Sequence, residues 1–343
     1  MRRTEGYLTA GSFWAFAGAG LLVWLAVGLG CLLPGQVDLP PGRILAILTG
    51  GAAEARDANI VLMQRLPRVL MGLLAGGGLA VAGAVFQALL RNPLATPHTL
   101  GVSAGGALGA VVAISLGLSG PALAGLSSVQ FFALVGALVN IGIVYLLARR
   151  SRAMSPLRLL LAGVTLGLIC SALIMFVRFV SDPHKLVMVD RWLMGGLDVH
   201  GYRSVGAVLP FFLPGLLLMV SQANALNQLA LGEEMAGGRG VSVGAVQREA
   251  FLAGSALTAA VVSVAGPIGF VGLLVPHALR GLFGPDHRLL LCLSFFGGGA
   301  FLAAADTVAR AAFAPSELPV GVLTAMLGGP FFLLLLVTRM REV

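Results

Sequence analysis

Charged residues are scarce in this chain of 343 residues: they make up 10% of it, against about 25% in an ordinary soluble domain. Hydrophobic residues make up 58% and are spread along the whole length, which excludes an ordinary soluble fold. Hydrocarbon offers no hydrogen-bond partners, so such a chain crosses a membrane as helices or as a closed barrel. Barrel strands are short and alternate in polarity, whereas the apolar runs here are long and unbroken. The composition therefore predicts an all-α integral membrane protein.

Lysine is nearly absent, because Lys185 is the only one in the chain. A nucleotide-binding Walker A loop needs Gly-Lys followed by Ser or Thr, since this lysine reaches the phosphates. His184 precedes Lys185, so the chain has no such loop. We therefore expect no ATP chemistry in this chain, neither as enzyme activity nor through a bound cofactor, and ATP-driven transport would require a separate ATPase subunit.

Potential metal ligands are few and dispersed. The cysteines lie far apart in or beside apolar runs, as expected of small core residues: Cys31, Cys170 and Cys292. No histidine has a partner at a recognised ligand spacing, so we expect no metal site. His277 and His287 flank a short apolar run, where we expect a structural role at helix ends. The net charge of +8 resides largely on arginines in short loops, where control of membrane topology explains it better than nucleic-acid binding.

Charge-poor runs of the roughly 20 residues that a spanning helix needs predict about ten spans within a single transmembrane domain, 1–343. The expected spans are Gly11–Leu33, Val69–Leu90, Leu94–Leu118, Ser128–Ala148, Leu159–Val180, Ser204–Asn224, Ala250–Ala265, Val271–Phe283, Leu289–Ala309 and Leu318–Thr338. The first is interpreted as a retained helix, because its apolar core is too long for a signal peptide. The boundary between the seventh and eighth is left open, since Gly266-Pro267-Ile268-Gly269 interrupts them.

An even number of spans places both termini on one side, with thirteen of the 22 Lys and Arg residues there and nine on the other. If the termini are cytoplasmic, this bias has the sign of the positive-inside rule but is weak. Arg65, Arg68 and Arg310 are outer arginines at helix ends and need another explanation. Asp306 lies four residues before Arg310, on the same helix face, so the two can pair. The pair either lowers the cost of insertion or directs Arg310 toward an external partner, and both can hold.

A polar, glycine-rich loop of about residues 225–248 separates the sixth and seventh spans. Its centre, Leu231–Val241, mixes small and charged residues. A solvated connection accounts for this composition, and so does a short helix docked on a soluble partner.

Six blocks of sequence, in order along nearly the whole chain, carry a close resemblance. They are Arg65-Leu66-Pro67-Arg68 with Asn92-Pro93-Leu94-Ala95; Leu159-Leu160-Leu161-Ala162-Gly163; Trp192-Leu193-Met194-Gly195-Gly196; Leu231-Gly232 with Ala236 and Gly240; Gly266-Pro267-Ile268-Gly269-Phe270 with Val275-Pro276-His277; and Asp286-His287-Arg288 through Glu317-Leu318-Pro319 to Gly329-Pro330. In these blocks the chain resembles the FecCD-like permeases of binding-protein-dependent ABC importers for iron siderophores, haem and vitamin B12.

The resemblance implies a vitamin B12 permease-like fold of ten helices in the bacterial inner membrane, with both termini cytoplasmic. It implies a homodimer or a pair of homologous permeases, two ABC ATPase subunits that bind ATP and Mg, and a periplasmic or lipid-anchored binding protein. The residues it implies for docking of the binding protein are Arg65, Arg68 and Arg310. Those for coupling to the ATPase are Leu231, Gly232, Glu233, Ala236, Arg239 and Gly240. Those for the gate and pathway are Asn92, Pro93, Leu94, Ser155, Pro156 and Leu157.

Two departures from the family pattern bear on function. Arg239 stands where family members usually carry an apolar residue, which alters the expected packing against the ATPase. Ser155-Pro156-Leu157 is less polar than the same loop of the vitamin B12 permease, which weakens a cobalamin assignment. A ferric siderophore, the commonest cargo of the family that the chain resembles, is the first expectation, followed by haem and then cobalamin.

Two functions of another class remain as alternatives. A stand-alone secondary transporter would need ionisable residues near the bilayer centre, but Asp306 and Arg178 fall near span ends. A membrane-embedded enzyme would need His, Asp or Glu groups that converge within the spans, and the sequence does not place such groups there.

Overall fold

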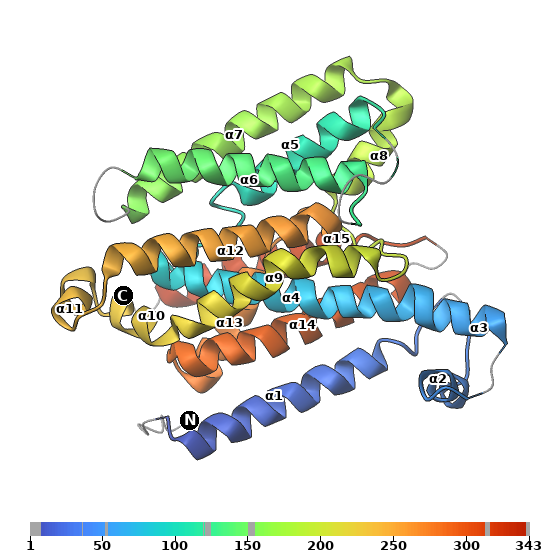
Figure 1. The fold of residues 1–343 in the computed structure, drawn as a ribbon, viewed down its shortest axis with the longest axis horizontal. Helices are drawn as coiled ribbons and strands as arrows, with labels where there is room; N and C mark the ends of the chain where they lie inside the picture. Colours follow the sequence, from blue (N-terminus) through green and yellow to red (C-terminus); the bar gives the residue numbers. More distant parts are fainter. Residues whose placement is uncertain are drawn as a thin grey trace.

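The structure, a computed structural model, describes residues 8–35, 37–51, 54–118, 120, 125–149, 155–312 and 316–340. Within these ranges it is helical throughout, and most long helices run along one common direction (Figure 1). Seven helices of this part are long and apolar enough to cross a membrane. They are α1 (Ala10–Gly30), α4 (Leu66–Leu89), α6 (Ser128–Ala148), α7 (Pro156–Val180), α9 (Arg203–Ser221), α12 (Val243–Ala265) and α14 (His287–Ala312). Three shorter apolar helices complete the ten predicted spans: α5 (Val102–Ser115), α13 (Val271–Phe283) and α15 (Val320–Met340).

The predicted boundaries agree with the structure to within a few residues except at the starts of two helices, and α6 and α13 match their expected ranges. The expected seventh span starts at Ala250, but α12 begins at Val243, so its first turns lie within the segment expected to be a loop. The expected span from Leu94 is wrong at its start, because α5 begins only at Val102.

Side-chain and backbone turns account for the late start of α5. The Asn92 Oδ1 atom accepts a hydrogen bond from the Leu94 amide at 3.0 Å, which closes a turn directly after α4. Thr96 and Thr99 then bond each other's backbone amides through their hydroxyl groups. Gly101 adopts a left-handed conformation, with φ 79°, immediately before the helix. The hydropathy of this segment is membrane-like, but its local bonding favours turns.

Helix α4 is the centre of the bundle. In the continuous helical segment Ala55–Leu89, which α4 completes, 89% of the most apolar 18-residue stretch is buried. Its glycines let neighbouring backbones approach closely, as small residues do in membrane helices. A Cβ atom on Gly76 would lie 2.1 Å from the Gly298 carbonyl oxygen of α14. One on Gly83 would lie 2.0 Å from the Gly272 carbonyl oxygen of α13. Helix α4 thereby packs closely against both α13 and α14.

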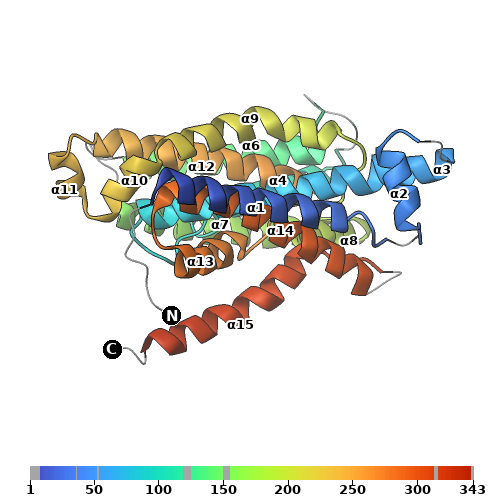
Figure 2. The ribbon, with the colours of Figure 1, turned by 90° about the horizontal axis from the view of Figure 1, so that it is seen from below.

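Short helices mark the two ends of the bundle. One end carries α2 (Pro41–Leu48), α3 (Ala55–Asn59) with the π-helical turn η1 (Ile60–Arg65), and α8 (Pro183–Leu193) (Figure 1). The other end carries α10 (Ala223–Ala230) and α11 (Glu233–Gly238). Helix α1 begins and α15 ends at the α11 end (Figures 1 and 2). This arrangement agrees with an even number of crossings. We call the α11 end the inner end and the α8 end the outer end.

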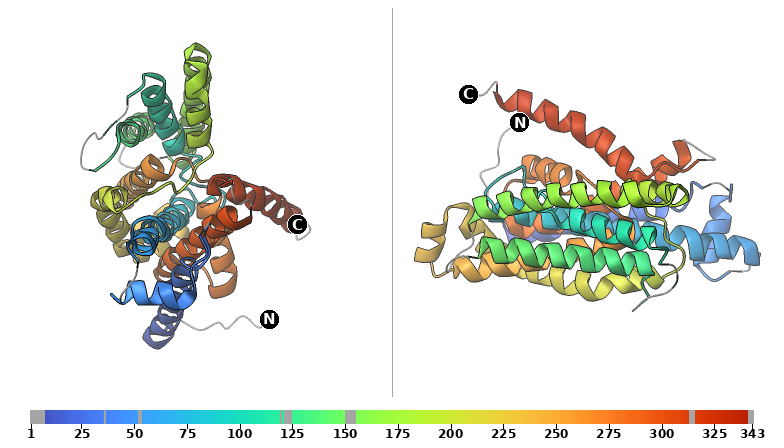
Figure 3. Two further views of the ribbon diagram at one scale, coloured as in Figure 1. Left: turned by 90° about the vertical axis from the view of Figure 1, so that its right-hand side faces the viewer. Right: turned by 90° about the horizontal axis from the view of Figure 1, so that it is seen from above.

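Two long helices stand out from the bundle. Helix α7 has only 11% of its membrane window buried, and α15 diverges from the bundle toward the inner end (Figure 2). Seen along the bundle, α7 and α15 project to different sides (Figure 3). Their exposed residues are mostly apolar, so lipid or another membrane subunit must cover them.

Candidate functional site

A buried ion cluster occupies the outer end of α4 and α14. The Asp306 carboxylate is 3% exposed and accepts two hydrogen bonds from Arg68, at 2.9 and 3.0 Å. Arg68 also donates to Glu317 at 2.8 Å, and Arg310 donates to Asp306 at 3.2 Å. The bidentate geometry of the Arg68 pair is the strong form of a charged hydrogen bond. The Asp306–Arg310 pair expected from the four-residue spacing is confirmed.

Arg65 lies beside this cluster but bonds differently. Its side chain is 4% exposed, and its guanidinium donates to three backbone carbonyls in the loop after α1, those of Leu32, Leu33 and Val37. Two neighbouring charges act on the Arg65 guanidinium: that of Arg310 repels it, and the carboxylate of Asp38 attracts it. Arg65 therefore ties the outer end of the α4 segment to the α1 loop, as a structural clamp.

The three predicted docking arginines line one cavity of about 430 Å³, which we call the outer socket. Arg56 lines it as well and is exposed to solvent. The acidic groups in its wall are Asp198 and Glu317. A carboxylate that enters this socket would meet several guanidinium groups. Arg56 is exposed at its wall, whereas Arg65, Arg68 and Arg310 are largely buried.

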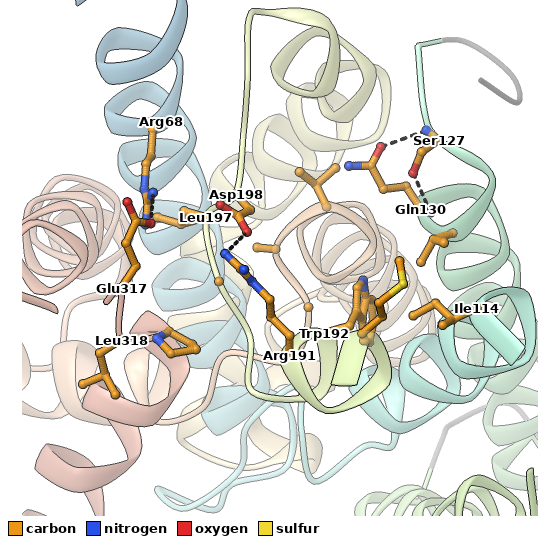
Figure 4. A pocket seen from close by; sticks show the side chains of 17 residues that line it. Arg68, Ile114, Ser127, Gln130, Arg191, Trp192, Leu197, Asp198, Glu317 and Leu318 are labelled. Atoms are coloured by element: carbon orange, nitrogen blue, oxygen red, sulfur yellow. Dashed lines mark hydrogen bonds and ion pairs between the residues drawn. The ribbon is translucent and has the colours of Figure 1, made fainter. Parts of the chain in front are cut away.

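A second cavity of about 310 Å³ adjoins the first, with Arg68, Asp198 and Glu317 lining both. Figure 4 shows Arg191 reaching toward Asp198 on one side of it, with Trp192 nearby. The Arg191–Asp198 distance is 2.8 Å, and both side chains are more than half exposed. The second cavity thus combines an aromatic surface with a solvated ion pair at the outer end of the bundle.

The inner end carries the predicted coupling residues. The short helix expected in Leu231–Val241 is present as α11 and is bounded by Gly232 and Gly240, which adopt φ values of 122° and 84°. Ala236 is buried, whereas Leu231 and Met235 are 52% and 53% exposed. Met235 of α11 and Leu231, the C-cap of α10 just before it, thus form an exposed apolar area at this end of the molecule.

Two ion or amide contacts fix α11 to its surroundings. Glu233 accepts from Arg91, directly after α4, at 3.0 Å. Arg239 donates to Gln228 of α10 at 2.6 Å. Arg239, the departure from the family pattern, therefore folds back onto α10 within this chain.

The predicted gate residues lie at the inner ends of two helices, in the turn after α4 and at the start of α7 (Figure 1). Asn92, Pro93 and Leu94 form the turn after α4, and Leu94 is 43% exposed. Ser155 precedes α7 and Pro156 opens it, so Pro156 provides the fixed φ angle that suits a first helical position. Leu157 is exposed beside them. Residues 150–154 of this loop lie outside the described residues.

Several residues at these sites could not be found from the sequence. Glu317 contacts Arg68 across 249 positions of sequence, and no spacing rule connects them. Asp198 pairs with Arg191 across the Gly195-Gly196 turn. Within the described ranges, no three His, Cys, Asp or Glu side chains are grouped as a metal ion would require.

Comparison with known proteins places these features in a family context. The model of the FecCD transport family matches residues 21–338 of the chain. The cobalamin import system permease protein BtuC of Halobacterium salinarum is 44% identical over 83% of this chain and 74% of that protein. The hemin transport system permease protein HmuU of Yersinia pestis is 41% identical over 83% and 84%, respectively. The iron(3+)-hydroxamate import system permease protein FhuG of Bacillus subtilis is 36% identical over 88% and 90%.

A solved structure is also similar to this chain. It is described as an inward-facing conformation of a metal-chelate type ABC transporter. The TM-score is 0.82 at 29% sequence identity, and the match covers 94% of this chain and 99% of that chain. The fold and the sequence blocks therefore indicate the same family.

Proposed function

Because this chain belongs to the FecCD transport family, we propose that it moves a metal chelate, in first place a ferric siderophore, across the membrane. It is a multi-pass permease subunit of an ABC importer, and the ATPase activity is carried by a separate subunit. Haem and cobalamin are the alternative cargoes of the same class.

The observation that carries this proposal is the chemistry shared by the relatives. Cobalamin, hemin and iron(3+)-hydroxamate are the cargoes that their names give, and all three are chelated metal ions. The identities of 44%, 41% and 36% do not separate the three cargoes, so the choice of siderophore also rests on the apolar Ser155-Pro156-Leu157 loop.

Uptake into proteoliposomes tests the cargo. The permease is reconstituted with its ATPase and binding protein, with ATP and Mg inside, and is offered a ferric hydroxamate, haem or cobalamin in separate assays. We expect ATP-dependent accumulation of the ferric hydroxamate. Accumulation of haem or cobalamin alone would select that alternative. Accumulation without any ATPase subunit would contradict the importer mechanism and favour a stand-alone secondary transporter.

The outer socket supports docking of a binding protein through acidic side chains. Arg65, Arg68 and Arg310 line it, and the exposed Arg56 adds a cation at its wall. Exposed charges at an interface mainly set the association rate and its salt dependence. Arg65 and Arg68 also hold the fold together, so Arg310 and Arg56 are the residues whose replacement tests docking most cleanly.

Single charge removals test this docking surface. Arg310→Gln and Arg56→Gln are expected to slow association of the binding protein at low salt, by roughly two- to tenfold each. The matched control is Arg203→Gln, which removes an exposed outer charge at the start of α9, away from the socket. Association that slows equally in all three variants would indicate long-range attraction without a specific socket.

The face of α11 supports coupling to the ATPase. Leu231 and Met235 expose apolar area there, next to Glu233, Arg239 and Gly240. Cysteine cross-linking from Met235 to the ATPase surface tests the contact, with a cysteine at the outer residue Ser316 as the negative control. A scan of α11 that yields no cross-link would exclude this role.

The remaining assignments concern assembly and orientation. The exposed faces of α7 and α15 support a homodimer, or a pair with a homologous permease, around a shared pathway. The gate turns at Asn92-Pro93-Leu94 and Ser155-Pro156-Leu157 would lie at its inner mouth. With ATP and Mg bound by the partner ATPase at α11, the inner end faces the cytoplasm of a bacterial cell, and both termini lie on that side.

A further inference from the structure

One side chain of α10 connects the coupling end of the molecule to the first turn of α14. The Asn227 amide nitrogen donates to Asp286 Oδ1 at 2.8 Å. Its carbonyl oxygen lies 2.8 Å from the His287 backbone nitrogen, which donates to it, and 2.8 Å from His287 Nδ1. Asn227 thus contacts both residues at which α14 begins.

The same contacts stabilise the start of α14. Asp286 accepts from the Arg288 backbone amide at 3.0 Å, as a helix-capping side chain does. Arg288 and Asn227 hold the pKa of Asp286 at about 2, so this carboxylate stays ionised. His287 is 5% exposed, and its Nε2 atom has no partner in the described structure. The polar groups at this helix end therefore depend on Asn227, because an unpaired buried group is costly.

Helix α14 extends from this contact to the ion cluster at the outer end. It contains no proline between His287 and Ala312, whereas α9, α13 and α15 each contain one or more. At its outer end Asp306 holds Arg68 of α4 with two hydrogen bonds. Between the ends, Gly76 and Gly298 allow the backbones of α4 and α14 to approach closely. The two helices therefore form one stiff unit that spans the bundle.

The coupling segment reaches this unit through apolar packing and through two polar contacts. Leu226 and Leu229 of α10 are buried in the core that α4 and α14 share. One polar contact is the Arg91–Glu233 ion pair, whose side chains are 46% and 31% exposed, so that water screens it. The other is Asn227, which joins α10 to Asp286 and His287 and is partly shielded from water. Of the two polar contacts, Asn227 is the one that would pass a displacement of α10 and α11 to α14 in a defined direction, because its hydrogen bonds are directional and less screened.

We propose that Asn227 is a positioning residue that passes movement of the coupling segment to α14, and through α14 to the outer arginine cluster. This proposal rests on the proposed function, since the movement originates in the ATPase subunit. Asn227 would contact neither ATP nor cargo, and its effect would be seen in the coupling between them.

The experiment compares variants of the full importer in proteoliposomes, with and without saturating binding protein. Asn227→Asp keeps the acceptor for the His287 amide but places a carboxylate against Asp286. The double variant Asn227→Asp with Asp286→Asn removes the like-charge contact and restores the hydrogen bond between these two positions with donor and acceptor exchanged, although the capping bond from the Arg288 amide to the same Asp286 oxygen is lost. The matched control is Asn224→Ala, one turn earlier on α10 at an exposed position.

We expect Asn227→Asp to assemble and to retain basal ATP hydrolysis, but to lose about tenfold in stimulation by the binding protein, a usual size for coupling between sites. The double variant is expected to regain most of this stimulation, and Asn224→Ala to behave as the wild type. Unchanged stimulation in Asn227→Asp, or a double variant no better than the single, would overturn the proposal. Complete absence of stimulation in the wild type would instead refute the proposed function, and the inference with it.

Discussion

Replacement of Asp306 by asparagine is the sharpest test of the outer ion cluster. Asparagine has the shape of aspartate, so the change removes one charge while the packing is retained. Two arginine side chains that are only 13% and 11% exposed then face each other without their shared carboxylate. Removal of one partner from a buried ion pair costs about 3–5 kcal/mol when the other charge is left uncompensated. Arg68 keeps its contact with Glu317 whereas Arg310 loses its carboxylate, so we expect the lower end of this range.

The same reasoning ranks the neighbouring substitutions. Arg310→Gln removes a hydrogen bond of 3.2 Å to Asp306 and a longer one of 3.4 Å to Thr307, and it leaves Asp306 bound twice by Arg68, so its cost should be about 1 kcal/mol. Arg68→Gln breaks the contacts to both Asp306 and Glu317 and should lie closer to the aspartate variant. The control is Asp198→Asn in the exposed pair with Arg191, where about 0–1 kcal/mol is at stake.

Thermal unfolding of the purified protein in detergent measures this order. Fluorescence-detected melting should give the largest decrease in Tm for Asp306→Asn, then Arg68→Gln, then Arg310→Gln, with Asp198→Asn close to the wild type. An unchanged Tm for Asp306→Asn would show that this end of the bundle is hydrated. A decrease for Arg310→Gln as large as that for Asp306→Asn would show that the bidentate pair does not dominate.

Three further changes probe other parts of the bundle. Gly76→Ala should lower Tm strongly or prevent assembly, because its Cβ would lie 2.1 Å from the Gly298 oxygen. The control Gly18→Ala in α1 meets nothing within 4 Å and should leave Tm unchanged. Size-exclusion profiles and thermal melting measure both variants. Arg65→Leu should expose the α1 loop to limited proteolysis, because three loop carbonyls lose their donor; an unchanged cleavage pattern would contradict the clamp. The pKa of Asp286 is lowered to about 2, so its stabilising effect is present above pH 3.8 and lost as the pH falls toward 2. The Tm difference between the wild type and Asp286→Asn should therefore stay constant from pH 5 to 8, and a difference that disappears below pH 6 would refute the low pKa.

Hydropathy was sufficient to place the membrane helices because each of them satisfies its own backbone hydrogen bonds. The start of α12 was placed seven residues too late, at Ala250 instead of Val243, because its first turns carry polar residues and leave the apolar run. The error at the start of α5 arose where a different local signal prevailed. Asn92, Pro93 and Pro97 are turn residues, but the apolar residues between them raise the hydropathy of the segment. Composition reports on the solvent that a segment prefers, whereas the start of a helix depends on which side chains bond its free amides.

The outer cluster shows the limit of spacing rules. Arg310 could be paired with Asp306 because they lie four residues apart on one helix. Arg68 lies 238 positions from Asp306, and only the packing of α4 on α14 brings them together. The outer arginines could be grouped by the side of the membrane they share. That Arg65 bonds backbone carbonyls could not be predicted, because every residue carries the same backbone acceptor.

The charges of the cluster explain how cations can remain at a membrane edge, and they fit the docking role that we propose for the outer socket. The guanidinium groups of Arg65, Arg68 and Arg310 contribute three positive charges, and Asp306 and Glu317 contribute two negative charges, which leaves a net charge of one. Self-repulsion is thereby small when no partner is bound. Arg56, which is exposed on the same wall, raises the positive potential at the mouth of the socket without burying another charge. Burial of Arg65, Arg68 and Arg310 fixes the shape of the socket, and the exposed Arg56 sets the strength of its attraction for an anion. One cluster can therefore serve both stability and the proposed recognition.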